Sequence, residues 1–290
     1  MTDEPQRRHE IESFINHMPA LPTSVAKVIE VCNQLQTSPN DLNHVISLDP
    51  VLTGKVLKLI NSAYFSLGEP VTSVTRAIIM LGLNTVKNLA LSTSIVGIFR
   101  EDSKEGCFSM NDFWVHSLAA GVTARMLAAG KGLPANTREE YFVGGLLHDI
   151  GKIPLMHCFP EDYRHSLKES HERRQPLYRA EQETLGFDHC HVGQIIGEKW
   201  RLSNNLASAL GSHHRGELAD DLAEFCDFIA AANICAKSFS WGSAGDGFFE
   251  DLTPLVQKKT GSGLHNLSRF QSDVAAELEK AKIFLAVSET

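Results

Sequence analysis

The stretch Val143-Gly-Gly-Leu-Leu-His-Asp-Ile-Gly-Lys152 places a histidine and an aspartate side by side at the end of an apolar run. A segment this apolar must pack in the core, and burying His148 and Asp149 there is costly unless they are paired or coordinated. Neutral imidazole binds borderline metals, and a carboxylate adds an anionic oxygen that can bridge two ions. The stretch therefore predicts either an internally paired His148 and Asp149 or a buried metal site that contains them.

The sequence on both sides of this stretch has the 3.6-residue periodicity of helices. Asp49-Pro50 is typical of an N-cap followed by proline at the first helical position. Ser73 and Ser109 are placed to cap further helices, and Gly82 is placed to end one. No segment alternates with period two for long enough to indicate a strand. We predict an all-α fold, a helical bundle in two lobes, that closes on a helix over about residues 267–285.

A polar, glycine-containing stretch over residues 100–107 is the best candidate for a boundary inside the chain. We predict an N-terminal helical lobe over 1–105 and a second helical lobe over 106–240. Residues 241–290 should form a loop and a C-terminal helix that packs on the bundle. Within them, 241–263 is rich in Gly and Ser, and we expect it to be the loosest segment.

Composition excludes several classes of protein. Apolar residues make up 43% of the 290 residues and charged ones 21%, which excludes wholesale disorder. The formal charge of −8 and the absence of a basic block argue against nucleic-acid binding. No apolar run reaches the roughly 18 residues of a transmembrane span, and the N-terminus lacks the apolar stretch of a signal peptide. Six dispersed cysteines without a CxxC are typical of reduced thiols, so we expect a cytoplasmic location.

The histidines are distributed unevenly. Six of the 13 fall within about 100 residues of helical pattern: His116, His148, His189, His191, His213 and His214. His116 lies inside an apolar helix, and alone it is more often a satisfied core histidine than a ligand. For all six together, a purely structural role is the weaker interpretation.

The order His116, then His148-Asp149, is similar to the metal-binding signature of HD-superfamily phosphohydrolases. The wider pattern resembles the HDOD branch, an all-α, HD-related output domain generally placed in bacterial signal transduction. The segments that carry this resemblance are Leu21-Pro22, Ile46–Leu57, Ile60–Phe65, Val74–Leu83, Gly144–Lys152 and Gly186–Trp200. The resemblance implies that the second lobe is HD-phosphohydrolase-like.

Residue by residue, the resemblance implies a metal site and a catalytic pair. The implied metal ligands are His116, His148, Asp149, His189, His213 and His214, the last three matching extra histidines of the multinuclear HD-GYP branch. Asp149 and Lys152 would be the catalytic residues, with Lys152 contacting a substrate phosphate. The cofactor would be a divalent transition metal, with iron, manganese, nickel and zinc all open. His191 stands where the family more often has an acid and could be an adventitious ligand.

Two departures qualify this expectation. The terminal aspartate of the signature falls on Asn233, which offers a carbonyl dipole in place of a full negative charge. No Gly-Tyr-Pro follows His213-His214, which argues against a cyclic-di-GMP phosphodiesterase of the HD-GYP kind.

Two hypotheses follow from these features. The favoured one is a regulatory signal-transduction protein with a partly retained HD metal site, whose partners are signalling proteins or a small phosphate-containing ligand. The alternative is an active metal-dependent phosphohydrolase on a nucleotide or phosphodiester.

Overall fold

All regular elements of the described chain are helices, which confirms the predicted all-α class. The computed structural model describes residues 4–34, 36–100, 107–214, 220–245, 247–248 and 267–288. The first part of the chain forms α1 (Glu4–His17), α2 (Thr23–Cys32), α3 (Pro39–Ser47), α4 (Pro50–Ile60), α5 (Val74–Leu81) and α6 (Leu83–Arg100). The middle part forms α7 (Met110–Gly130), α8 (Ala135–Leu147), α9 (Lys152–Cys158), α10 (Pro160–Arg173) and α11 (Leu177–Leu185). The last part forms α12 (His189–Lys199), α13 (Asn204–Ser212), α14 (Asp220–Ser238), α16 (Leu267–Ala281) and α17 (Ile283–Ser288).

Helix ends that carry capping residues lie where the sequence predicts them. The Asp49 side chain accepts a hydrogen bond from the backbone N–H of Leu52 at the start of α4. Ser73 and Ser109 cap α5 and α7 in the same way. Gly82 ends α5 with a φ of 87°, a conformation that costs glycine little because it has no Cβ.

Other helices are not predicted by the periodicity of the sequence. Helices α1 and α10 are strongly polar and bury only narrow stripes, such as Ile11 and Ile15 in α1. Neither these two nor α3 and α9 are predicted from periodicity. The predicted C-terminal helix is divided into α16 and α17, with the break at Lys282.

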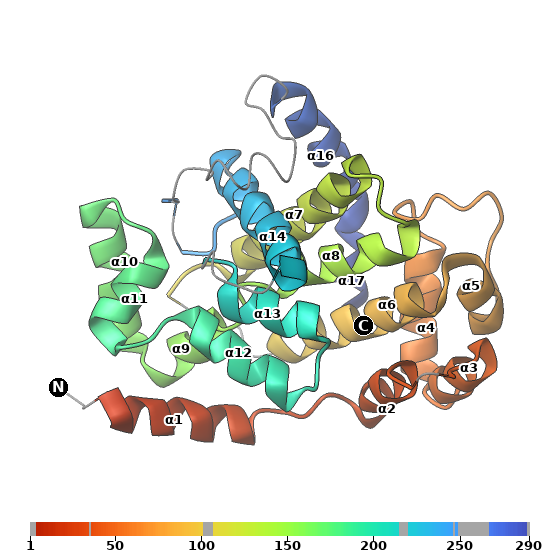
Figure 1. The fold of residues 1–290 in the computed structure, drawn as a ribbon, viewed down its shortest axis with the longest axis horizontal. Helices are drawn as coiled ribbons and strands as arrows, with labels where there is room; N and C mark the ends of the chain where they lie inside the picture. Colours follow the sequence, from red (N-terminus) through yellow and green to blue (C-terminus); the bar gives the residue numbers. More distant parts are fainter. Residues whose placement is uncertain are drawn as a thin grey trace.

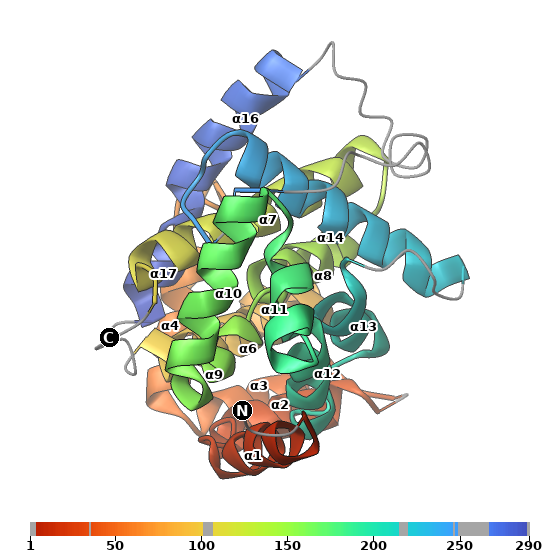
Figure 2. The same cartoon turned by 90° about the vertical axis from the view of Figure 1, so that its left-hand side faces the viewer.

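The helices pack in two groups joined by α6 (Figures 1 and 2). Helices α2 to α5 pack on one another and on α6, and α6 also packs on α8. Helices α7, α8 and α14 form the centre of the larger group, with α12 and α13 beside them. Helix α1 crosses to pack on α9 and α12, whereas α17 returns to α6 and α4. The exact lobe boundaries remain a prediction, because 101–106 and most of 241–263 lie outside the described residues.

Membrane-spanning potential is confined to one bent pair of helices. In the described chain no single helix is both long and apolar enough to cross a membrane. Helix α5 and residues 83–99 of α6 reach that length and apolarity only together, across a bend of 118°.

Helices α7 and α8 approach closely at a glycine. A Cβ on Gly145 would lie 2.6 Å from the carbonyl oxygen of Ala120 and 2.7 Å from the Cα of Gly121. Real Cβ atoms essentially never come that close to backbone, so only glycine allows the two helices to touch here. This contact lies one helical turn from His116 along α7 and one turn from His148, so it brings these two side chains toward each other.

We predict that Gly145→Ala destabilises the fold by about 1–3 kcal/mol, because its methyl group forces α7 and α8 apart. Gly54→Ala is the matched control, since a Cβ at that helical position meets nothing within 4 Å. The control should be neutral or stabilising by up to about 1 kcal/mol through helix propensity. Urea unfolding followed by circular dichroism measures both, and equal effects of the two substitutions would contradict the close-contact argument.

Candidate metal centre

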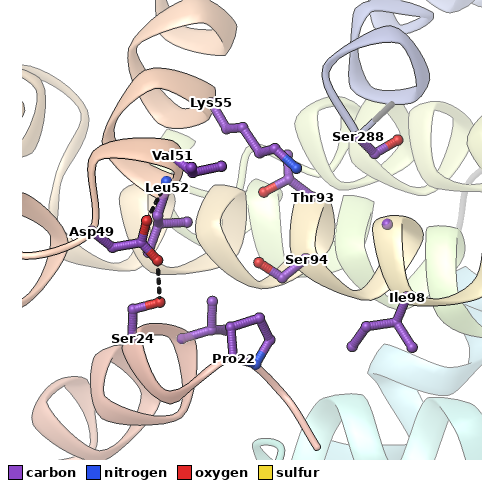
Figure 3. A pocket seen from close by; sticks show the side chains of 12 residues that line it. Pro22, Ser24, Asp49, Val51, Leu52, Lys55, Thr93, Ser94, Ile98 and Ser288 are labelled. Carbon is purple, nitrogen blue, oxygen red and sulfur yellow. Dashed lines mark hydrogen bonds between the residues drawn. The ribbon is translucent and has the colours of Figure 1, made fainter. Parts of the chain in front are cut away.

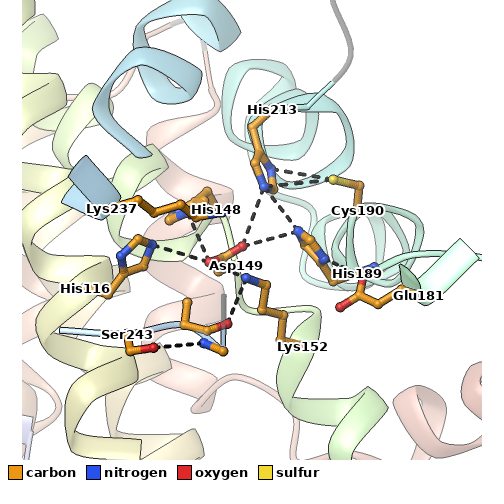
Figure 4. A network of polar contacts seen from close by, with 12 residues as sticks. His116, His148, Asp149, Lys152, Glu181, His189, Cys190, His213, Lys237 and Ser243 are labelled. Atoms are coloured by element: carbon orange, nitrogen blue, oxygen red, sulfur yellow. Dashed lines mark hydrogen bonds and ion pairs between the residues drawn. The ribbon is translucent and has the colours of Figure 1, made fainter. Parts of the chain in front are cut away.

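The predicted metal ligands come from four places along the chain and meet in one buried centre (Figure 4). His148 and Asp149 directly follow α8, and His116 lies in the middle of α7. His189 is the first residue of α12, and His213 and His214 directly follow α13. Among these residues, His148, Asp149 and His189 are completely buried and only His214 is half-buried.

The Asp149 carboxylate lies between two groups of imidazoles. Its Oδ2 is 3.5 Å from His116 Nε2 and 3.3 Å from His148 Nε2. Its Oδ1 is 3.3 Å from His189 Nε2 and 3.6 Å from His213 Nε2. One carboxylate thus presents a different oxygen to each group, which is the arrangement expected of a ligand that bridges two cations.

Three of the histidines are oriented by hydrogen bonds from their outer nitrogens. His148 Nδ1 lies 2.7 Å from the Gly145 carbonyl oxygen, and His213 Nδ1 lies 2.8 Å from the carbonyl oxygen of Ala209. His189 Nδ1 lies 2.6 Å from a carboxylate oxygen of Glu181. Each Nδ1–H donates outward, so each Nε2 faces the centre. Metal-binding histidines almost always have such an outer partner.

Several buried polar atoms lack hydrogen bonds within the described structure. They include His116 Nε2, His148 Nε2, Asp149 Oδ1 and Asn233 Oδ1. Asn233 lies one turn before Lys237 on the same face of α14. Buried polar atoms without partners are rare in folded proteins. A cation would satisfy these lone pairs, so the residues fit a divalent metal ion.

The charges of the centre are unevenly distributed. Burial opposes ionisation of Asp149, but neighbouring His148 and Lys152 hold its pKa well below the usual value. Burial lowers the pKa of His148 to about 4, so this imidazole is neutral near pH 7. Burial also disfavours charged His189, but the Glu181 carboxylate outweighs it and raises the pKa of His189. The centre thus has a fixed anion, Asp149, and a neutral imidazole ready to act as a ligand.

Lys152 neutralises Asp149 and closes the centre. Its Nζ donates to Asp149 Oδ2 at 2.9 Å and to the Ala244 carbonyl oxygen at 3.0 Å. The segment around Ala244 is held in turn by a hydrogen bond of 3.0 Å from Ser243 N–H to the Asp112 carbonyl oxygen. Lys152 and Ala244 are both completely buried. The lysine predicted to meet a substrate phosphate is therefore occupied by the protein's own carboxylate and backbone.

The sequence matches a known protein family. The HDOD domain profile matches residues 18–216, more than half of the chain. The chain belongs to the HDOD family. A relative from Treponema pallidum (strain Nichols), an uncharacterized protein, is 24% identical over 228 residues. The match covers 78% of this HDOD chain but 44% of the relative, so the chain spans less than half of the relative's length.

Solved structures share the HDOD fold over nearly the whole chain. An HDOD domain protein of unknown function from Geobacter sulfurreducens has a TM-score of 0.73 and 21% identity, covering 99% of both chains. A proposed phosphohydrolase from Shewanella amazonensis SB2B has a TM-score of 0.70 and 21% identity over 95% of this chain and 98% of its own. A proposed signal transduction protein from Marinobacter aquaeolei VT8 has a TM-score of 0.75 and 16% identity, covering 100% of this chain and 67% of its own. At these identities the likeness establishes the fold.

The structure adds two residues to the centre of this HDOD protein that sequence reasoning missed. Glu181 of α11 orients His189, and Cys190 lies beside His213. The sequence indicates a role for Cys190 only through the run Asp188-His-Cys-His191, which places its thiol next to the predicted ligand His189. His191 itself points elsewhere, with Nε2 3.0 Å from the Arg8 guanidinium. The ring of His214 stacks on Tyr178, with centroids 4.6 Å apart.

A cavity of about 300 Å³ lies between α2, α4 and α6 (Figure 3). Asp49 on its wall accepts a hydrogen bond of 2.6 Å from Ser24 Oγ, which joins the starts of α2 and α4. Thr93 and Ser94 donate to carbonyl oxygens of their own helix. The lining contains none of the predicted site residues, so this cavity is separate from the histidine centre.

We predict that Lys152→Met destabilises the metal-free protein by about 3–5 kcal/mol, because it leaves the buried Asp149 charge without its ammonium partner. Lys168→Met is the control, since Lys168 is mostly exposed and pairs with Glu172 at 3.7 Å. Its expected effect is about 0–1 kcal/mol. Urea unfolding in the presence of a chelator measures both variants. A loss below about 1 kcal/mol for Lys152→Met would show that Asp149 does not depend on this ion pair.

Proposed function

We propose that this HDOD protein is a regulatory signal-transduction protein that holds a divalent transition metal in a closed centre. The observation that carries the proposal is the engagement of Lys152 by Asp149 and Ala244, all three of which are completely buried. A substrate phosphate would have to displace both contacts before it reached the lysine. Such a site is better suited to holding an ion than to turning over a substrate.

Two sets of side chains would hold metal. His116, His148 and Asp149 form one group whose ligand atoms all lie within 4.8 Å of one another. His189, His213 and His214 belong to a second group that meets the same criterion, and Asp149 Oδ1 faces it. Imidazole and carboxylate ligands suit iron, manganese, nickel or zinc. A bound ion would supply Lewis-acid chemistry, acidifying a water molecule or polarising a phosphate oxygen.

Asn233 supports the regulatory proposal from the charge balance. A carboxylate there would add a second full negative charge to the first group, whereas the amide adds only a dipole. The first group then has one anionic ligand, Asp149, and that anion is already balanced by Lys152. This weakens the case for a standard hydrolytic HD site.

The alternative function is a metal-dependent phosphohydrolase acting on a nucleotide or phosphodiester. What favours it is the convergence of His116, His148 and His189 on Asp149, with Lys152 within hydrogen-bond distance of the same carboxylate. In that case Lys152 would leave Asp149 and neutralise charge on the phosphate. A screen of metal-loaded protein against nucleotides and phosphodiesters tests this. Turnover that Lys152→Met abolishes would favour the enzyme over the regulator.

The partners follow from the regulatory proposal. We expect signalling proteins or a small phosphate-containing ligand, in a cytoplasmic setting and without nucleic acid. The net charge of −8 supports the last expectation.

We predict that protein purified without chelator contains one to two equivalents of divalent metal and that His148→Ala abolishes this binding. His148 is completely buried, but its ring faces the centre, and within the described part of the chain its one hydrogen bond is to the Gly145 carbonyl oxygen. The exposed His165 in α10 provides the matched control, and His165→Ala should retain the metal. Elemental analysis and circular dichroism are measured together. Metal-free wild-type protein would contradict the metal proposal, whereas loss of helicity in His148→Ala would indicate a structural histidine.

We predict that Asn233→Asp tightens metal binding on the order of tenfold, because a charged ligand is worth about 1–1.5 kcal/mol more than a neutral one. Asn40→Asp adds the same charge at an exposed position of α3 and should leave the affinity unchanged. Competition with a chelating dye gives the dissociation constants. Equal affinities for Asn233→Asp and the wild type would mean that residue 233 is not the fourth ligand.

A further inference from the structure

Cys190 is the one thiol drawn into the histidine centre. It follows His189 in the first turn of α12 and is completely buried. Its Sγ lies 3.7 Å from His213 Nδ1 and 3.9 Å from His213 Nε2. The ligand atoms of His189, Cys190, His213 and His214 all lie within 4.8 Å of one another. Three imidazoles and one thiol are thus gathered around one point.

We propose that Cys190 binds metal as a thiolate, so that His189, Cys190, His213 and His214 form a His₃Cys position of the zinc type. The inference rests on the metal centre proposed above and names the fourth ligand of its second group. It also separates the two groups chemically, because the first has only nitrogen and oxygen donors.

The spacing of the donor atoms agrees with a four-coordinate zinc-type ion. Zinc binds imidazole nitrogen at about 2.0–2.1 Å and thiolate sulfur at about 2.3 Å, so tetrahedral neighbours lie roughly 3.3–3.5 Å apart. The two nitrogens His189 Nε2 and His213 Nε2 are 3.4 Å apart. Sγ is 3.9 Å from the same His213 nitrogen, and a small movement of its flexible side chain closes that difference.

The outer hydrogen bonds select the same nitrogens. His189 Nδ1 is bound to Glu181 and His213 Nδ1 to the Ala209 carbonyl oxygen, so both rings present Nε2 to the shared point. A thiol that only formed a hydrogen bond with His213 would not require these rings to converge. The convergence of Cys190 with all three rings is therefore the observation that favours coordination.

A thiolate at this position also changes the charge count of the whole centre. Asn233 removes one anionic ligand from the first group, and Cys190 contributes one to the second group. With Asp149 counted in the first group, the two metal positions together would still have two anionic ligands. A sulfur donor shifts the preference of the second position toward zinc and cobalt and away from manganese and magnesium.

Cobalt(II) substitution tests the inference directly. Metal-free protein is titrated with Co²⁺, whose visible d–d bands report binding and whose near-ultraviolet charge-transfer band reports a cobalt–thiolate bond. We expect both bands in the wild type. In Cys190→Ser we expect the charge-transfer band to disappear and the affinity of the second position to fall by at least about tenfold, the lower end of what losing even an outer partner of a ligand costs. Cys226→Ser is the matched control, because Cys226 is a buried thiol of α14 outside the ligand group, and it should retain the band.

The outcomes separate this inference from the metal proposal. Visible bands without a charge-transfer band in the wild type would overturn the thiolate ligand and leave the histidine centre intact. No cobalt binding at all would overturn the metal centre and the inference with it. Loss of the band in Cys226→Ser but not in Cys190→Ser would overturn the assignment to Cys190. The wild-type spectrum decides the main question even where Cys190→Ser fails to fold.

Discussion

The Asp149 carboxylate is the group on which the centre of this protein depends. It is completely buried, and a buried charge is tolerated only when it is paired and hydrogen-bonded. Its partners come from distant parts of the chain, because Lys152 starts α9, His116 lies in α7 and His189 starts α12. Holding one anion in the core therefore fixes the relative positions of several helices.

Close helix packing brings the partners of the buried Asp149 carboxylate together. Glycine at position 145 lets α8 touch α7, and the carbonyl oxygen of the same residue orients His148. Gly151 acts similarly, since a Cβ there would lie 2.0 Å from the His189 carbonyl oxygen. Both glycines flank the His148-Asp149 pair. Close backbone approach on either side of this pair is what allows imidazoles from two further helices to reach the carboxylate.

The sequence predicts those helix caps and helix ends that depend only on neighbouring residues. The cap at Asp49 and the end of α5 at Gly82 depend on neighbouring residues, and both lie where the pattern places them. The periodicity does not predict helix α10, because its polar sequence buries a stripe too narrow to stand out. The pair His148-Asp149 was recognisable from its apolar context. The involvement of Cys190 was not recognisable from the sequence, because the direction of a side chain in α12 depends on how that helix is rotated against α13.

The role of Lys152 is another property that only the assembled structure carries. A lysine three residues after an aspartate is compatible with substrate binding or with an internal ion pair, and the sequence cannot distinguish the two. In the structure Nζ lies between Asp149 Oδ2 and the Ala244 carbonyl oxygen. A metal ion on Asp149 Oδ2 and the ammonium of Lys152 would compete for the same oxygen. Lys152 also donates to the Ala244 carbonyl oxygen, so a metal ion that displaced its ammonium from Asp149 would act on a side chain that contacts a second segment of the chain as well.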